Sequence, residues 1–227
     1  MKNLVLLLFA LTYAISYAQD APEDVNTRLD VVGDLNTFGT GLWIKSKRKA
    51  KVKGDIYLFR NWDNLASVIT GQGKKYKFKR INYDTKQDRF VIKTSPDSLF
   101  VFSAQSIKQV KLNNKIFKRY FKDDLYSYLE LIAFGKGKEV LKKSFKIIKK
   151  GIKDPFTNTN KSDEYVLKTK YFLNSESGLR AWKLRKKDFL KFFGEDSNKI
   201  KEIIATHKLS LKKDSDLIKI FEYYKNK

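Results

Sequence analysis

The chain of 227 residues contains no cysteine and a single histidine. Without cysteine it can form no disulfide, and it offers neither a thiolate nucleophile nor a thiolate ligand for a metal ion. With one histidine, no histidine pair can bind a metal from one helix face. The stability of the fold must therefore come from packing, and we expect no metal site and no cofactor.

Long apolar runs are also missing, except at the start of the chain. Residues 4–11 are almost continuously apolar, Lys2 precedes them, and residues 16–18 (Ser-Tyr-Ala) end in a small residue at a cleavage position. This is the anatomy of a secretory signal peptide, so we assign residues 1–18 to it and expect an exported, periplasmic or secreted protein. No later apolar stretch approaches the roughly 20 residues that a transmembrane helix requires.

Acidic residues are scarce relative to basic ones. The 48 lysines and arginines outnumber 25 aspartates and glutamates, for a formal net charge of +23. Such an excess attracts anions over a Debye length of about 8 Å at physiological salt. Lysine prevails over arginine, whereas bidentate phosphate recognition favours arginine. The lysines therefore indicate either an anion-binding surface or protection of sheet edges, and we do not expect nucleic-acid binding.

Three regions follow the signal peptide. Residues 19–45 form an acidic, glycine-containing arm that either folds back onto the basic run after it or has no fixed structure. Residues 46–184 have the two-residue alternation and turn signals of an antiparallel β domain. Residues 185–227 form a C-terminal helical segment that packs on the β domain.

The β domain is predicted to be a meander. We expect strands at 52–59, 75–83, 88–94, 98–103, 107–112, 115–121, 125–134, 138–149, 164–173 and 179–184. Turn residues at 113–114, 135–137 and 174–178 predict consecutive hairpins, hence an antiparallel curved sheet, sandwich or partial barrel. Within 75–83 the apolar residues change phase, which predicts a β-bulge near Lys79.

Toward the C-terminus the apolar period changes from two to 3.6 residues. A first short helix ends at Gly194, and apolar stripes cover 200–207 and 217–224. Asp214 is placed to cap the last helix. We therefore expect two or three short amphipathic helices packed on the meander, which is an α+β fold.

Two segments resemble an uncharacterised family of small secreted bacterial proteins. The first is 53–59 (Lys-Gly-Asp-Ile-Tyr-Leu-Phe), followed by Trp62. The second is the tail 184–224, with its runs 186–190 and 216–220. The resemblance implies a shared β-then-helix fold, and it carries over no functional motif.

Most catalytic patterns are missing. His207 extends the apolar stripe that begins at residue 200, so we interpret it as a packed or boundary residue. No Gly-x-Ser-x-Gly motif is present. Gly71 and Gly73 lack the lysine-serine ending of a phosphate loop and predict a turn. We therefore expect no enzymatic activity.

A pair of carboxylates could still hydrolyse a glycosidic bond, since that chemistry needs only two acids about 5 to 9.5 Å apart. Glu130 is the main candidate for a general acid because it shares a strand face with Tyr128 and Ile132. The competing interpretation is an edge residue paired with a lysine. Asp84 and Asp88 flank a turn and are assigned to hairpin geometry. The other candidates are Asp123, Asp124, Asp154 and Glu164. A hydrolase of envelope or extracellular glycans is thus the alternative function.

The main prediction is a binding role in the cell envelope or outside the cell. The lysines chosen as a binding surface gather on two predicted hairpin arms. They are Lys75, Lys77, Lys79, Lys142, Lys143, Lys146, Lys149 and Lys150. Expected ligands are anionic envelope components, namely lipid headgroups or acidic polysaccharide, or else an acidic face of a partner protein.

Overall fold

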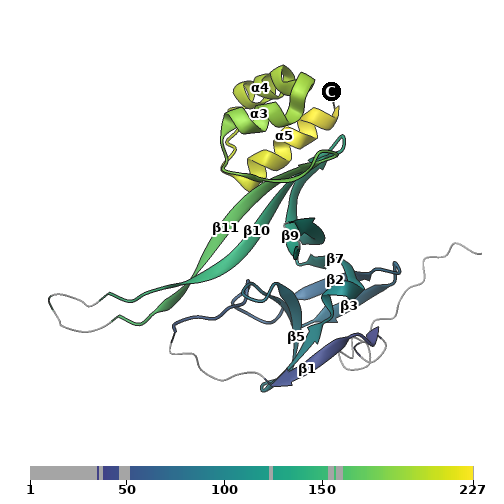
Figure 1. Cartoon of the computed structure of the whole chain (residues 1–227), viewed down its shortest axis with the longest axis vertical. Coiled ribbons are helices and arrows are strands. Elements are labelled where there is room, and N and C mark those ends of the chain that lie inside the picture. Colours follow the sequence, from purple (N-terminus) through teal and green to yellow (C-terminus); the bar gives the residue numbers. More distant parts are fainter. Residues whose placement is uncertain are drawn as a thin grey trace, which may run out of the picture.

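The computed structural model describes residues 35, 38–45, 52–122, 125–152, 156 and 161–226. The predicted signal peptide and most of the acidic arm lie outside these residues. So do three candidate carboxylates, Asp123, Asp124 and Asp154. In the part of the chain that is described, antiparallel strands precede a C-terminal group of helices, which confirms the predicted α+β class (Figure 1).

The strands form two sheets. They are β1 (Gly41–Lys45), β2 (Leu65–Thr70), β3 (Lys75–Lys79), β4 (Ile81–Asp84), β5 (Arg89–Ser95), β6 (Ser98–Phe102), β7 (Ile107–Leu112), β8 (Lys115–Lys122), β9 (Leu125–Gly135), β10 (Lys138–Lys149), β11 (Glu164–Ser175) and β12 (Gly178–Trp182). One sheet has the order β1-β6-β5-β4 and the other β12-β11-β10-β9-β8-β7-β2-β3. The predicted meander is therefore the run from β7 to β12 in the larger sheet.

The helices follow the last strand. They are α3 (Lys186–Phe193), α4 (Ser197–Thr206) and α5 (Asp214–Asn226); the 3-10 helix η2 (Gly194–Asp196) joins α3 to α4, and η1 (Ala104–Ser106) precedes β7. Gly194 takes a φ of 60° at the end of α3, where the sequence predicted a stop. None of the helices among the described residues is long and apolar enough to cross a membrane.

The body, as we call the lower part of Figure 1, is the four-stranded sheet packed on strands β2, β3, β7 and β8 of the larger sheet. Phe90 lies 5.5 Å from Phe117 and 4.9 Å from Tyr128 between ring centroids, edge to face in both pairs. Such pairs add about 0.5–1.5 kcal/mol beyond the burial of their area. Aromatic contacts between the two sheets therefore make up much of the body core.

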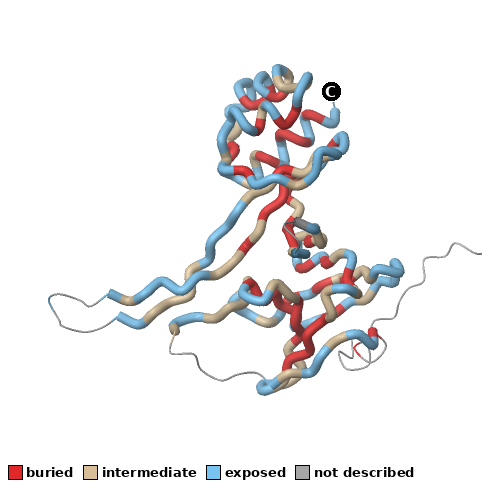
Figure 2. The backbone as a smooth tube through the Cα atoms, in the orientation of Figure 1, coloured by how far each residue is buried: buried red, intermediate tan, exposed pale blue. Residues whose placement is uncertain are grey.

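The head, as we call the upper part, consists of α3, α4 and α5 packed on the β9–β12 end of the larger sheet. The apolar stripe of α5 is buried through Leu217, Ile220, Phe221 and Tyr224. Buried residues thus gather in two groups, one in the lower sheets and one beneath the helices (Figure 2). The helices cover the sheet as predicted.

One row of side chains crosses the larger sheet from body to head. In-register partners on neighbouring strands point to the same face. The row is Tyr76, Val68, Val110, Phe117, Glu130, Lys142, Tyr171 and Trp182. Its two ends contact the body core and the head core. The two cores therefore occupy one face of one sheet, with the charged pair Glu130 and Lys142 between them.

The strand predicted at 52–59 is wrong, because this segment forms only isolated bridges. The buried side chain of Asn82 accepts a hydrogen bond from the backbone N–H of Phe59 at 3.1 Å and donates to its carbonyl at 2.9 Å. A side-chain amide that provides both a donor and an acceptor can replace a strand partner. The backbone N–H and carbonyl of Phe59 are therefore hydrogen-bonded without a β ladder.

The bulge predicted within 75–83 is also wrong. The phase of the apolar residues changes because the chain leaves one sheet at β3 and enters the other at β4. Arg80 takes a φ of 58° at this break, in the left-handed region that ends a strand. Phe78 and Ile81 on either side both point into the body core.

Two further strands differ from the prediction. The sequence did not predict β2, although it lies inside the larger sheet. The last five residues of the acidic arm form β1, which pairs with β6. The predicted turns, in contrast, are confirmed, with positive φ at Asn113, Lys136 and Gly178. Asp84 accepts hydrogen bonds from the backbone of the turn that follows it, as expected.

Candidate binding surface

Part of the predicted lysine array is exposed on the edge strand β3. Lys75, Lys77 and Lys79 are exposed, whereas Tyr76 and Phe78 between them contact the body core. Because successive side chains of a strand point to opposite faces, the lysines of β3 lie on one face and its aromatic residues on the other. The ammonium groups of β3 lie on the outer side of the sheet.

A fourth lysine joins this surface from β7. Ser67 of β2 is in register with Lys77 on one side and with Lys111 on the other, so all three share the outer face. We define the lysine face as Lys75, Lys77, Lys79 and Lys111. In the part of the chain that is described, no carboxylate forms an ion pair with any of them.

Lys142 is not part of a ligand surface. Its side chain is buried, and its Nζ lies 3.4 Å from Glu130 Oε2 and also contacts Asp214 of α5. The hydroxyl of Tyr171 donates to Asp214 Oδ1 at 2.8 Å. The predicted cap Asp214 is thus the first residue of α5, and its carboxylate contacts the sheet. Lys142 therefore joins β9 to the head.

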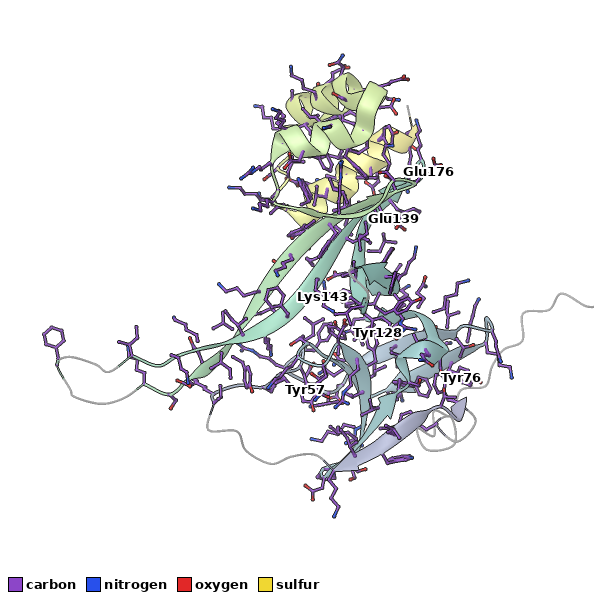
Figure 3. The ribbon with its side chains drawn as sticks, in the orientation of Figure 1. Tyr57, Tyr76, Tyr128, Glu139, Lys143 and Glu176 are labelled. Carbon is purple, nitrogen blue, oxygen red and sulfur yellow. The ribbon has the colours of Figure 1, made fainter. Side chains whose placement is uncertain are left out.

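Lys143 lies at the centre of a second polar cluster, between the head strands and the body (Figure 3). Its Nζ is 2.6 Å from Asp88 Oδ1 and donates to Tyr83 OH at 2.8 Å and Ser127 Oγ at 2.7 Å. Burial lowers the pKa of Lys143, and the Asp88 carboxylate opposes this shift. Burial, and then the neighbouring Asp88 carboxylate, raise the pKa of Tyr83. The cluster joins the β4–β5 turn to β9 and β10.

A serine beside a lysine is also the arrangement of Ser-Lys hydrolases, in which the lysine accepts the serine proton. Here the Ser127 hydroxyl donates a hydrogen bond to Asp88 Oδ2 at 2.6 Å. Lys143 Nζ donates to Tyr83 OH, to Ser127 Oγ and, at 3.4 Å, to the carbonyl of Tyr128, and three donated hydrogen bonds require the protonated ammonium. The geometry therefore favours a polar connection between the sheets over an activated nucleophile.

The remaining lysines of β10 also differ from one another. Lys146 is largely buried, and its Nζ lies 3.0 Å from Asp55 Oδ1. The side chains of Lys149 and Lys150 are 64 % and 84 % exposed and lie near carboxylates at the start of β11. The predicted lysine array is therefore not one surface. It divides into the exposed lysines of β3, the paired lysines of β10 and an exposed end.

The main hydrolase candidate, Glu130, is buried at 5 % exposure. Its Oε1 is 2.5 Å from Lys115 Nζ, and its Oε2 contacts Lys142. Both carboxylate oxygens therefore contact lysine ammonium groups inside the sheet. The predicted pairing of Glu130 with lysine is confirmed, but its predicted edge position is wrong, because β9 lies between β8 and β10.

His207 does not extend the buried stripe of α4, so that prediction is wrong. It follows the helix as its C-cap and is exposed, with its ring stacked on Tyr223 at 4.0 Å between centroids. Within the described ranges, no group of histidine and carboxylate side chains could hold a metal ion. The histidine therefore lies apart from the polar clusters described above.

Comparison of the chain with protein-family models, curated proteins and solved structures gives no match in any of the three. The resemblance to small secreted bacterial proteins stays a prediction and contributes no site residues. The function must therefore be argued from the surfaces and clusters of this chain alone.

Proposed function

We propose that the protein is exported and binds anionic material of the cell envelope or its surroundings through the lysine face, without acting as an enzyme. The observation that carries this proposal is a group of four exposed lysines that have no carboxylate partner in the described part of the chain. Other lysines of the chain are used in ion pairs. In the lysine face, four neighbouring ammonium groups remain available to a ligand.

The spacing of the lysine face suits a repeating anion. Alternate residues of one strand are about 6.8 Å apart, and neighbouring strands about 4.8 Å apart. Lys75, Lys77 and Lys79 therefore form a line, and Lys111 lies two strands away. Each exposed contact contributes at most about 1 kcal/mol. Affinity must then come from several contacts at once and fall steeply with salt.

The competing explanation is that the lysines only protect an edge strand from pairing with other chains. For this protection the lysines of β3 need only be charged, and they need not bind a ligand. It predicts that loss of the lysines raises aggregation and leaves anion binding unchanged. Binding and aggregation must therefore be measured on the same variants.

The test compares two triple variants of the mature chain that change the net charge equally. One is Lys75→Gln/Lys77→Gln/Lys79→Gln, and the other replaces three exposed lysines of α3, Lys186→Gln/Lys187→Gln/Lys191→Gln. Binding to phosphatidylglycerol vesicles and to polygalacturonate is measured at low and high salt. We expect the β3 variant to lose roughly tenfold in affinity at low salt, equivalent to about 1.4 kcal/mol, and the α3 variant to lose little. Equal losses in the two variants would attribute binding to net charge and overturn the proposal.

The proposed export has its own test. Expression of the full chain in a bacterial host, followed by fractionation and N-terminal sequencing, should give a product that begins at Gln19 outside the cytoplasm. A cytoplasmic product that retains residues 1–18 would contradict export. The binding experiment would be unaffected, because it uses purified protein.

A further inference from the structure

Residues 143–149 of β10 and 164–170 of β11 form a two-stranded extension of the larger sheet, which we call the projecting ribbon. The pairing of β10 with β9 ends at Lys142, and the pairing of β11 with β12 begins at Tyr171. Figure 1 shows the two strands continuing together away from the head, to the left of the body. Residues 53–55 hold part of it, because Lys53 pairs with Glu164 and Lys146 Nζ donates to Asp55 Oδ1 at 3.0 Å. A hairpin of two strands is otherwise marginally stable in water, so the apolar side chains that it leaves exposed need an explanation.

The projecting ribbon and the residues after it expose large aliphatic side chains. Ile147, Ile148 and Leu167 are 42 %, 43 % and 46 % exposed, and Ile152 is 73 % exposed. Ile147 is in register with Val166, and Leu167 with Lys146. Because neighbouring residues of a strand point to opposite faces, Ile147 and Ile148 expose apolar surface on both faces of the ribbon.

The same segments keep some cationic charge unpaired. Of the seven lysines in residues 143–152 and 161–170, four lie beside carboxylates. Lys161, Lys168 and Lys170 form no ion pair within the described residues, and Lys170 lies over the ring of Phe145 at 5.3 Å. A second copy of this chain would bring like charges together, so self-association is disfavoured.

The distribution of these groups distinguishes between possible partners. A folded acidic protein or a polysaccharide chain could neutralise the lysines, but it would cover one face of a thin ribbon. A lipid bilayer surrounds an inserted element on both sides and accepts apolar side chains below the headgroups and lysines among the phosphates. We propose that the projecting ribbon inserts Ile147, Ile148 and Leu167 into the interface of an anionic lipid bilayer. This inference rests on the proposed function and narrows its anionic material to a membrane surface.

The first experiment uses the absence of native cysteine. Ile147→Cys in the ribbon and Ile218→Cys on α5, where the native side chain is similarly exposed at 41 %, each give one site for an environment-sensitive fluorophore. We expect vesicles of phosphatidylglycerol and phosphatidylcholine to shift the emission of the Ile147 label to the blue and to leave the Ile218 label unchanged. Pure phosphatidylcholine vesicles and polygalacturonate should shift neither. A blue shift with polygalacturonate alone, or none with anionic vesicles that bind the protein, would overturn insertion.

A second experiment measures affinity without a label. Ile147→Ser/Leu167→Ser should weaken binding to the anionic vesicles several-fold, whereas the control Ile218→Ser/Tyr223→Ser, also at exposed positions, should not. Equal affinities of both variants and the native chain would contradict insertion and leave the lysine face as the binding surface. A different result would be that the β3 variant binds vesicles as well as the native chain does while the Ile147 label still shifts. That result would contradict binding through the lysine face and support insertion of the projecting ribbon. The two proposals thus fail by different results.

Discussion

The body and the head cover the apolar face of the larger sheet with different elements. Both cover the same face of one eight-stranded sheet, but a second sheet covers it in the body and three helices cover it in the head. Both regions bring together distant parts of the chain, since α5 packs on β9 in the head and β2 pairs with β7 in the body. The difference lies in the covering element, because the sheet beneath is continuous.

The boundary between the two cores is charged. Glu130 and Lys142 lie in the row whose neighbours are Phe117 on the body side and Tyr171 on the head side. Burying an ion pair has a desolvation cost that its attraction often fails to exceed. We therefore interpret this pair as a device for specificity: a buried charge here prevents the two apolar surfaces from merging in another register.

The largest expected effects come from removing an aromatic ring from each core. Phe117→Ala in the body and Phe221→Ala in the head both delete a buried ring, at 2 % and 1 % exposure. Each should lower the free energy of unfolding by about 3–5 kcal/mol. Chemical denaturation followed by circular dichroism measures this loss.

The same two variants test whether the cores open separately. Because a charged boundary divides them, we expect Phe117→Ala to speed hydrogen exchange mainly in β2, β4 and β7, and Phe221→Ala to speed it mainly in α4 and α5. Uniform acceleration throughout the chain in both variants would show one cooperative unit and contradict the division into body and head.

A smaller loss of stability is expected from removing one charge of the buried pair between the two cores. Lys142→Met removes the ammonium that links Glu130 to Asp214. Glu130 keeps Lys115 as a partner, so the loss should be about 3 kcal/mol, at the lower end for a broken buried pair. The denaturation midpoint of the purified variant gives this value.

The double variant Glu130→Met/Lys142→Met is the matched control. It removes both buried charges and leaves Asp214 and Lys115, which are about one-third exposed, to be solvated. We expect it to be more stable than Lys142→Met alone, because replacing a buried pair by apolar residues is often neutral. A double variant less stable than the single one would show that the pair stabilises the fold directly.

The sequence predicted the head better than the body because the signals that define a helix and its end are local. The end of α3 at Gly194 and the stripe of α5 are local signals, and both are confirmed. In contrast, β2 has apolar residues on both faces, with Leu65 51 % exposed, so its alternation is weak. Its place in the sheet depends on β7, far along the chain.

The sequence also could not distinguish the exposed lysines from the lysines that form ion pairs. Lys77 and Lys142 both lie in strands rich in lysine, and nothing local distinguishes them. The partner of Lys142 is 72 residues away, and that of Lys146 is 91 residues away. Strand alternation indicates that a lysine faces one side of a sheet, but the carboxylate that meets it there is fixed only by the tertiary fold.

The smallest expected effect concerns a polar contact inside the head. The hydroxyl of Tyr224 donates to Asp196 Oδ2 at 2.6 Å, and burial, followed by this hydrogen bond, raises the pKa of Tyr224 to about 12. Tyr224→Phe should cost about 1.5 kcal/mol at neutral pH, the lower end of the range for a hydrogen bond to a charged group. The measurement is the free energy of unfolding of the variant and the native chain across the alkaline range.

The contribution of Tyr224 to the free energy of unfolding should decrease as the pH rises. Because the folded pKa of Tyr224 lies above its ordinary value of 10.0, the native phenol keeps its proton at a pH where the unfolded chain has lost it. The contribution of Tyr224 is therefore complete below about pH 10 and falls as the pH approaches 12. The difference in stability between the native chain and Tyr224→Phe should narrow over that range, whereas the control Tyr223→Phe, at a more exposed position, should show no such change. A difference that is constant to pH 12 would mean that the hydrogen bond to Asp196 does not hold the phenol proton.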